Sequence, residues 1–176
     1  MELAKSAGRW PSWMWMGIVL LSAAARLVPH PWNFTPLVAI GLFAGVYAES
    51  AIAAAAATLL FLALGDLVLG FYPGILWNYA AALVPVMLGR WARGRKGASV
   101  AGAALASSLS FFAISNFSVW AGGLIYPRTL AGLASCYAAG VPFYRNQIAG
   151  DAFYTLLMFG AYELLVRRYR ISRAAA

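Results

Sequence analysis

The scarce acidic residues are the first candidates for chemistry in this chain, which holds only five of them among 176 residues. Asp66 and Asp151 fall inside strongly apolar stretches, and so does the basic residue Arg26. A charge inside an apolar helix bundle is costly, so such charges pair with one another or line a wet cavity. The sequence leaves three uses open: an ion-pair network that Arg128 or Arg145 joins, direct contact with a ligand, or proton coupling.

A second group of polar side chains lies in segments rich in proline and aromatic residues. These side chains are amides, hydroxyls, guanidinium groups and one imidazole, and a ligand pocket needs only a few such groups on an apolar wall. Tryptophan and tyrosine also anchor proteins at membrane interfaces, which is the competing interpretation of the aromatic members. The predicted ligand-binding residues are His30, Asn33, Asp66, Tyr72, Asn78, Asn116, Trp120, Arg128, Tyr144, Arg145, Asn146 and Asp151.

The only thiol, Cys136, and the only imidazole, His30, restrict what catalysis is possible. One cysteine forms no internal disulfide, and no spacing typical of a metal site is present. The patterns of an ATP-binding loop, a zinc protease and a serine hydrolase are missing as well. We expect no enzyme, no catalytic residues, no cofactor and no resident metal. Two alternatives stay open: a membrane-embedded enzyme that uses Cys136 or His30, and Cys136 as a ligand to a soft metal such as the cobalt of a corrinoid. A lone cysteine in an apolar segment is more often a packing residue.

The composition decides the surroundings in which these residues must be positioned. Hydrophobic residues make up 63% of the chain and charged residues 10%, whereas a soluble domain has about 25% charged residues. Long apolar runs recur along the whole chain, which indicates an all-α polytopic membrane protein forming a single domain over residues 1–176. The net charge of +8 agrees with basic residues that face the cytoplasm and the anionic lipid headgroups at that membrane surface. We therefore expect no nucleic-acid partner.

The positions of the basic clusters predict the number of membrane crossings. The apolar stretch from 37 to 70 is interrupted by Glu49-Ser50, and treating it as a helical hairpin places ten of the thirteen basic residues on one side. Because basic loops face the cytoplasm, both termini are predicted to be cytoplasmic in a bacterial inner membrane. A cleaved signal peptide at the start would not change this orientation. The predicted helices cover about 13–28, 37–48, 51–70, 74–90, 98–121 and 147–167, with an outer loop at 122–146. The apolar middle of this loop, from Thr129 to Ala139, could form a short helix at the interface or folded back over the bundle.

Small residues recur four positions apart, as in Gly41 and Gly45 and in the run Ala53 to Ala57. This spacing lets membrane helices approach closely. Both packing within the bundle and docking of a membrane partner agree with it.

Four motifs lie at 29–36 (Pro-His-Pro-Trp-Asn-Phe-Thr-Pro), 65–72 (Gly-Asp-Leu-Val-Leu-Gly-Phe-Tyr), 115–120 (Ser-Asn-Phe-Ser-Val-Trp) and 142–146 (Pro-Phe-Tyr-Arg-Asn) with Gly150-Asp151. These motifs resemble an uncharacterised bacterial family of six-helix transport-type proteins. That family is similar in size and layout to the S components of energy-coupling factor (ECF) vitamin transporters, which bind a vitamin or metal ion from outside. The S-component-like bundle that this resemblance implies would take a small-molecule substrate in its outer loops and pass it on with a membrane coupling subunit and two ATPases.

One departure from the S components concerns the first helix. S components carry an Ala-x-x-x-Ala pattern there, whereas this chain follows Ala23, Ala24 and Ala25 with Leu27 and Val28. Docking to a shared coupling subunit therefore does not follow from the resemblance. A non-transport membrane scaffold that binds a partner remains the alternative function.

Overall fold

Six α-helices and no strand make up the part of the chain that the structure describes. The computed structural model describes residues 12–95 and 97–174. The first five helices begin and end within two residues of the predicted bounds. Lys5 and Arg9, which support the predicted orientation, lie outside the described residues. The helices are α2 (Ser12–Leu27), α3 (Leu37–Tyr47), α4 (Ala51–Leu69), α5 (Ile75–Ala92), α6 (Gly97–Gly122) and α7 (Leu130–Ala174).

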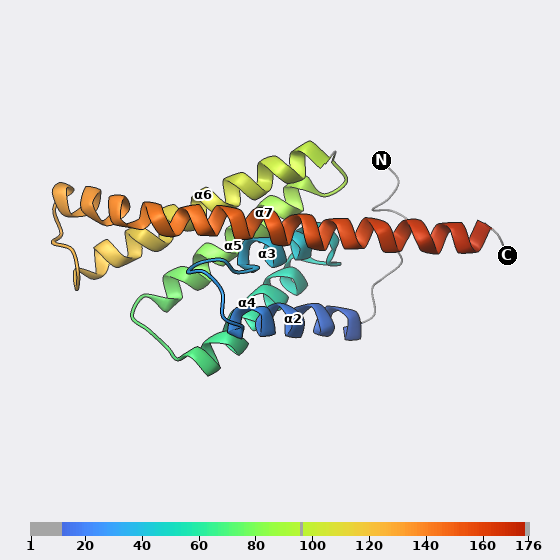
Figure 1. The fold of residues 1–176 in the computed structure, drawn as a ribbon, viewed down its shortest axis with the longest axis horizontal. Helices are drawn as coiled ribbons and strands as arrows, with labels where there is room; N and C mark the ends of the chain where they lie inside the picture. Colours follow the sequence, from blue (N-terminus) through green and yellow to red (C-terminus); the bar gives the residue numbers. More distant parts are fainter. Residues whose placement is uncertain (1–11, 96, 175–176) are drawn as a thin grey trace.

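The connections between helices alternate between the two ends of the bundle (Figure 1). The segments 28–36, 70–74 and 123–129 lie at one end, which also holds the start of α7. The segments 48–50 and 93–95 lie at the opposite end, toward which α7 runs. Successive helices therefore run in opposite directions through the bundle.

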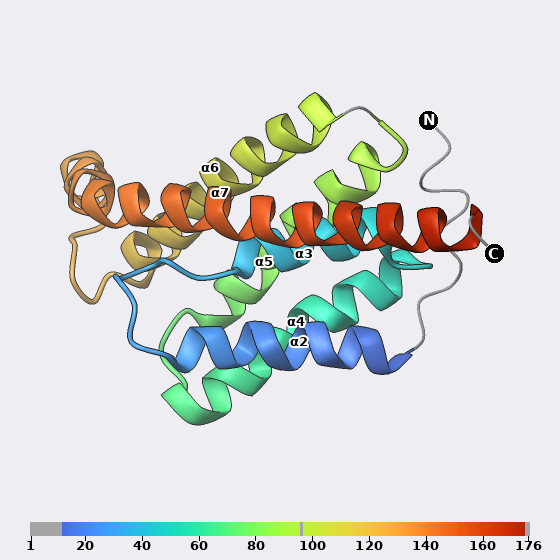
Figure 2. The same ribbon diagram turned by 45° about the vertical axis from the view of Figure 1, so that its right-hand side comes forward.

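The prediction of an outer loop at 122–146 that holds at most a short helix is wrong from residue 130 onward. The structure has only a short connection at 123–129, and Leu130 begins a helix of 45 residues. Figure 2 shows the first turns of this helix almost end-on, whereas the rest lies across the view. Pro142 lies inside α7, and proline bends a helix because its ring removes a backbone donor and crowds the preceding turn. Pro142 and the polar residues after it interrupt the apolar pattern in the sequence without ending the helix.

The shortest helix, α3, lies at the centre of the bundle. Every residue from Leu37 to Val46 is buried, and α4, α5, α6 and α7 all pack around it. Eleven residues rise about 16 Å, roughly half the thickness of a bilayer core. A short helix is tolerated in this position because neighbouring helices surround it.

Small residues bring α3 and α5 into backbone contact. A side chain at Gly45 would place its Cβ atom 2.9 Å from the Cα atom of Gly89, and one at Gly41 would lie 2.9 Å from Pro85 Cβ. Both distances are too short for real Cβ contacts. Gly41 and Gly45 therefore serve packing within the bundle, and they are not available to a docking partner.

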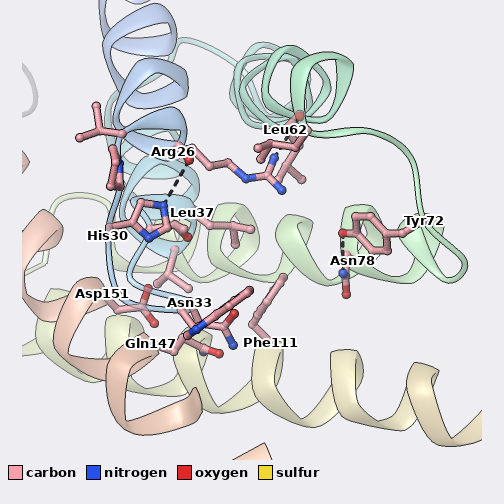
Figure 3. Close-up of a pocket in the computed structure, with 16 residues that line it drawn as sticks. Arg26, His30, Asn33, Leu37, Leu62, Tyr72, Asn78, Phe111, Gln147 and Asp151 are labelled. Carbon is pink, nitrogen blue, oxygen red and sulfur yellow. Dashed lines mark hydrogen bonds between the residues drawn. The ribbon is translucent and has the colours of Figure 1, made fainter. Parts of the chain in front are cut away.

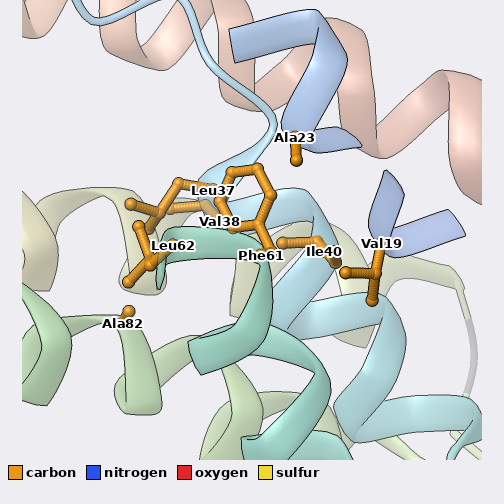
Figure 4. Close-up of a cluster of buried hydrophobic side chains, with 8 residues drawn as sticks. All are labelled: Val19, Ala23, Leu37, Val38, Ile40, Phe61, Leu62 and Ala82. Carbon is orange, nitrogen blue, oxygen red and sulfur yellow. The ribbon is translucent and has the colours of Figure 1, made fainter. Parts of the chain in front are cut away.

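Apolar side chains fill the interior and also cover the outside. Figure 4 shows one interior cluster, in which Val19, Ile40, Phe61 and Leu62 join α2, α3 and α4. On the outside, helices other than α3 expose large apolar side chains, among them Leu156 at 75%. Two helices, α4 and α6, are long and apolar enough to cross a membrane. Monomeric soluble proteins rarely expose so much apolar surface, so these observations support a membrane protein.

Candidate functional site

A cavity of about 480 Å³ opens at the end of the bundle that carries the segment 28–36 (Figure 3). Its wall is mixed, with apolar residues such as Leu62 and Phe111 between polar ones. The cavity begins where the short helix α3 begins, because Leu37 and Val38 line it. Its polar lining residues come from the end of α2, the segment 28–36, the segment 70–74, the start of α5 and the middle of α7: Arg26, His30, Asn33, Thr35, Tyr72, Asn78, Gln147 and Asp151.

Arg26 and Asp66 form an ion pair beside this cavity. The Nη2 atom of Arg26 lies 2.7 Å from Oδ1 of Asp66, whose side chain is 1% exposed. Nη1 of Arg26 also donates a hydrogen bond of 3.2 Å to the carbonyl oxygen of Leu62. Gly65 leaves the space that the guanidinium occupies, since a Cβ atom there would lie 2.7 Å from Nη1. Asp66 therefore pairs with Arg26 and does not itself line the cavity, whereas Arg26 does.

The segment 28–36 is held in place at three points. The two ring nitrogens of His30 lie 2.8 Å from the Pro31 carbonyl oxygen and 3.2 Å from that of Arg26, which ties the segment to α2. Asn33 has a φ of 63°, a left-handed conformation that asparagine adopts more readily than most residues. Gly150 lets the segment pack closely on α7, because a Cβ atom at this position would lie 3.0 Å from the Cα atom of Phe34.

Asp151 lies on the cavity side of α7 and is 3% exposed. The side chains of Ser108 and Gln147 hydrogen-bond to its carboxyl group. Its Oδ2 atom is buried and has no hydrogen-bond partner among the described residues. Gln147 is itself fixed, because its Nε2 atom donates to the carbonyl oxygen of Ser108 over 2.8 Å. The result is a rigid carboxyl group with unused accepting capacity.

A second buried acceptor belongs to Asn78, at the start of α5. Its Nδ2 atom donates to the hydroxyl oxygen of Tyr72 over 2.7 Å. Its Oδ1 atom is buried and, within the described part of the chain, accepts no hydrogen bond. Figure 3 shows the Tyr72–Asn78 pair well away from Asp151, at another part of the wall. The cavity thus offers unsatisfied acceptors at two separate points.

Seven of the predicted ligand-binding residues do not line this cavity: Asp66, which pairs with Arg26, and six residues from Asn116 onward. Asn116 donates to the carbonyl oxygen of Phe112 on its own helix. Trp120 donates to the carbonyl oxygens of Pro127 and Thr129, so it fixes the connection between α6 and α7. The remaining four lie elsewhere as well: Arg128, which donates to the Gly122 carbonyl oxygen; Tyr144, which packs on Phe112; and Arg145 and Asn146, which are exposed and half-buried respectively.

Cys136 is a packing residue on the inner face of α7. It is 2% exposed, and its thiol donates to the carbonyl oxygen of Asn116 over 3.3 Å. Among the described residues no group of three histidine, cysteine or acidic side chains is placed to hold a metal ion. The thiol does not face the cavity, so this geometry gives no support to a soft-metal site.

Sequence reasoning missed Thr35, Gln147 and Ser108. Gln147 precedes Asp151 by four residues, and residues at this spacing share one face of a helix. That spacing would have identified Gln147 once residues 142–151 were taken as helical. Ser108 gave no such signal, because only the packing of α6 on α7 brings it to Asp151.

A second cavity, of about 520 Å³, lies between α2 and α7. Its lining is nearly all apolar, with residues such as Ile18, Leu21, Leu157 and Leu165, and it includes no charged residue. A cavity of this kind offers little to select a polar molecule. The cavity at Asp151 is therefore the candidate binding site.

The fold and the cavity define an all-helical protein with membrane character and a polar cavity at one end. The chain belongs to the Family of unknown function (DUF6580), whose model matches residues 8–174. Neither a curated protein nor a solved structure matches the chain.

Proposed function

We propose that this protein is the substrate-binding membrane subunit of a transporter that takes up a small, vitamin-like molecule. In this proposal all six helices cross a bacterial cytoplasmic membrane and both termini are cytoplasmic. The ligand enters the cavity at Asp151 from the outer face. A membrane coupling subunit with ATPases supplies the energy.

The distribution of basic residues supports this orientation. Arg90 and Arg93 both donate hydrogen bonds to the Ala48 carbonyl oxygen, over 2.9 Å and 3.1 Å, at the end of α3. The end of α5 and the segment 93–95, which carry Arg90, Arg93 and Arg95, lie at the bundle end opposite the cavity. Basic residues at helix ends favour the cytoplasmic side. The cavity then faces outward, where a substrate-binding subunit must receive its ligand.

The observation that carries the proposal is a built polar cavity within a strongly apolar bundle. A ligand pocket is typically a cavity of 300–1,000 Å³ with a few fixed polar groups, and the cavity at Asp151 agrees in size and in lining. Exposing polar side chains to an interior cavity has an energetic cost in a small protein. That cost is explained if the groups bind a molecule.

The first test is native mass spectrometry of the protein purified in mild detergent from its own host. A bound small molecule at one-to-one stoichiometry supports the proposal. The proposal would be contradicted by a protein that carries no bound molecule, together with unchanged uptake of vitamin-like molecules by cells that lack the gene.

A scaffold that binds a membrane partner is the second candidate function. The observation in its favour is the start of α4, where Ala51, Ala53 and Ala56 are exposed beside Ile52. Small exposed residues permit close approach of another helix. A second polypeptide that co-purifies with a ligand-free protein would favour this candidate.

A further inference from the structure

The charges around the cavity determine which ligand chemistry it accepts. Arg26 is the one lysine or arginine that lines the cavity in the described part of the chain. Its charge is already balanced by Asp66 at 2.7 Å. Asp151 forms no ion pair among the described residues, so when its carboxyl group is ionised the wall carries a negative charge that no lysine or arginine balances.

The burial of Asp151 and the unpartnered oxygen of its carboxyl group make this unbalanced charge costly. The Asp151 side chain is only 3% exposed, and its Oδ2 atom has no hydrogen-bond partner in the described structure. A buried carboxylate is stable only with a cation or enough hydrogen-bond donors. Ser108 and Gln147 supply two interactions, which leaves the remaining accepting capacity to a molecule in the cavity.

The start of α3 also faces the cavity and must be weighed. The N-terminus of a helix carries about half a positive charge, which favours anions. That partial charge is smaller than the full charge of a carboxylate, and it lies on a helix whose first residues, Leu37 and Val38, are apolar. It therefore reduces the negative character of the cavity without reversing it.

We infer that the ligand carries a protonated amino group, which pairs with Asp151, on an aromatic or other flat framework. This inference rests on the proposed function and narrows its substrate class. Two further features of the wall agree with it. The unpartnered Oδ1 of Asn78 accepts a second N–H group at a separate point. Trp32 and Phe111 line the same cavity, and aromatic faces attract cations.

The test uses three probes of similar shape and different charge: benzylamine, benzyl alcohol and benzoate. Binding to the purified protein at neutral pH is followed by the shift in melting temperature and by tryptophan fluorescence. We expect saturable binding of benzylamine that is at least tenfold tighter than that of the other two. Asp151→Asn should weaken benzylamine at least tenfold, whereas Asp151→Glu should retain most of the affinity.

Arg145→Ala is the matched control, since this exposed residue does not line the cavity and its loss should leave benzylamine binding unchanged. Equal or tighter binding of benzoate, unchanged benzylamine binding by Asp151→Asn, or no saturable binding to the wild type overturns the inference. The co-purified molecule separates the two proposals. A bound molecule without a basic nitrogen overturns the inference and leaves the binding function standing, whereas the absence of any bound molecule and of any uptake defect contradicts the binding function itself.

Discussion

Arg26 Nη2 lies 2.7 Å from Asp66 Oδ1, and this ion pair joins the end of α2 to the last turn of α4. The pair is almost fully enclosed, with side-chain exposures of 14% for Arg26 and 1% for Asp66. It anchors α2, which otherwise packs mainly on α4. The pair therefore holds Arg26 in the cavity wall, and Asp66 balances the positive charge that Arg26 brings there.

Removal of one partner of this pair should destabilise the protein strongly. Arg26→Met leaves the buried Asp66 carboxylate without its cation, and losing one partner of a buried pair costs about 3–5 kcal/mol in free energy of unfolding. Unfolding in detergent, followed by circular dichroism, measures the loss. The double variant Arg26→Met with Asp66→Leu should lose less than the single variant, because no charge remains buried. Strictly additive losses would show that the two residues do not interact.

The contact between α3 and α5 predicts a sharp difference between two glycines. Gly45→Ala should lower the free energy of unfolding by about 1–3 kcal/mol, because the new Cβ atom would collide with the backbone at Gly89 and α5 must move. Gly102→Ala in α6 is the control, since nothing lies within 4 Å of a Cβ atom there. Alanine favours the helix by about 1 kcal/mol relative to glycine, so the control should be neutral or stabilising. Equal stability of the two variants would contradict the close packing.

Ligand retention should depend on Asn33 and not on Arg145. Asn33→Gly removes the amide while keeping the left-handed backbone, which glycine adopts without steric strain. Losing one hydrogen bond of about 1 kcal/mol predicts an affinity roughly fivefold lower. Native mass spectrometry with titration of the co-purified molecule measures this affinity. Arg145→Ala should bind as the wild type does. A loss at Arg145 with no loss at Asn33 would place the binding site in another part of the molecule.

The proposed orientation predicts which introduced cysteines react from outside the cell. In a Cys136→Ala background, Ile125→Cys should react with a membrane-impermeant maleimide in intact cells, because residues 123–129 lie at the cavity end. Gly97→Cys, at the opposite end, should react only after the membrane is permeabilised. Both positions are exposed, so a difference between them reports the side of the membrane. The reverse pattern would place the cavity in the cytoplasm.

Local properties of the sequence are sufficient to predict most of the helices. Apolar runs broken by Pro31 and Pro36, by Glu49-Ser50 and by Arg93 mark the ends of helices, because each break removes a backbone donor or introduces charge. The same reasoning failed at Pro142, where a break in the pattern was taken as a loop. Neighbouring helices bury one face of α7 there, and this packing outweighs the local cost of a proline.

The sequence also identified part of the cavity, since His30, Asn33, Tyr72, Asn78 and Asp151 were expected to bind a ligand and all line it. These residues are recognisable because polar groups beside proline and aromatic residues stand out in an apolar chain.

Only the tertiary structure shows which of those polar groups contact one another. Depth along a helix does not show which face a residue occupies, so the sequence placed Arg128 and Arg145 beside Asp66 and Asp151 as readily as Arg26. Helix packing selects Arg26 as the partner of Asp66 and turns Arg145 outward. It also brings Ser108 and Gln147 to Asp151 from two helices and leaves Oδ2 without a partner in the described structure. The sequence by itself determined which groups are present and where most of the helices begin and end. The rotation of each helix about its axis, set by close packing at Gly45, Gly65 and Gly150, determined which groups meet.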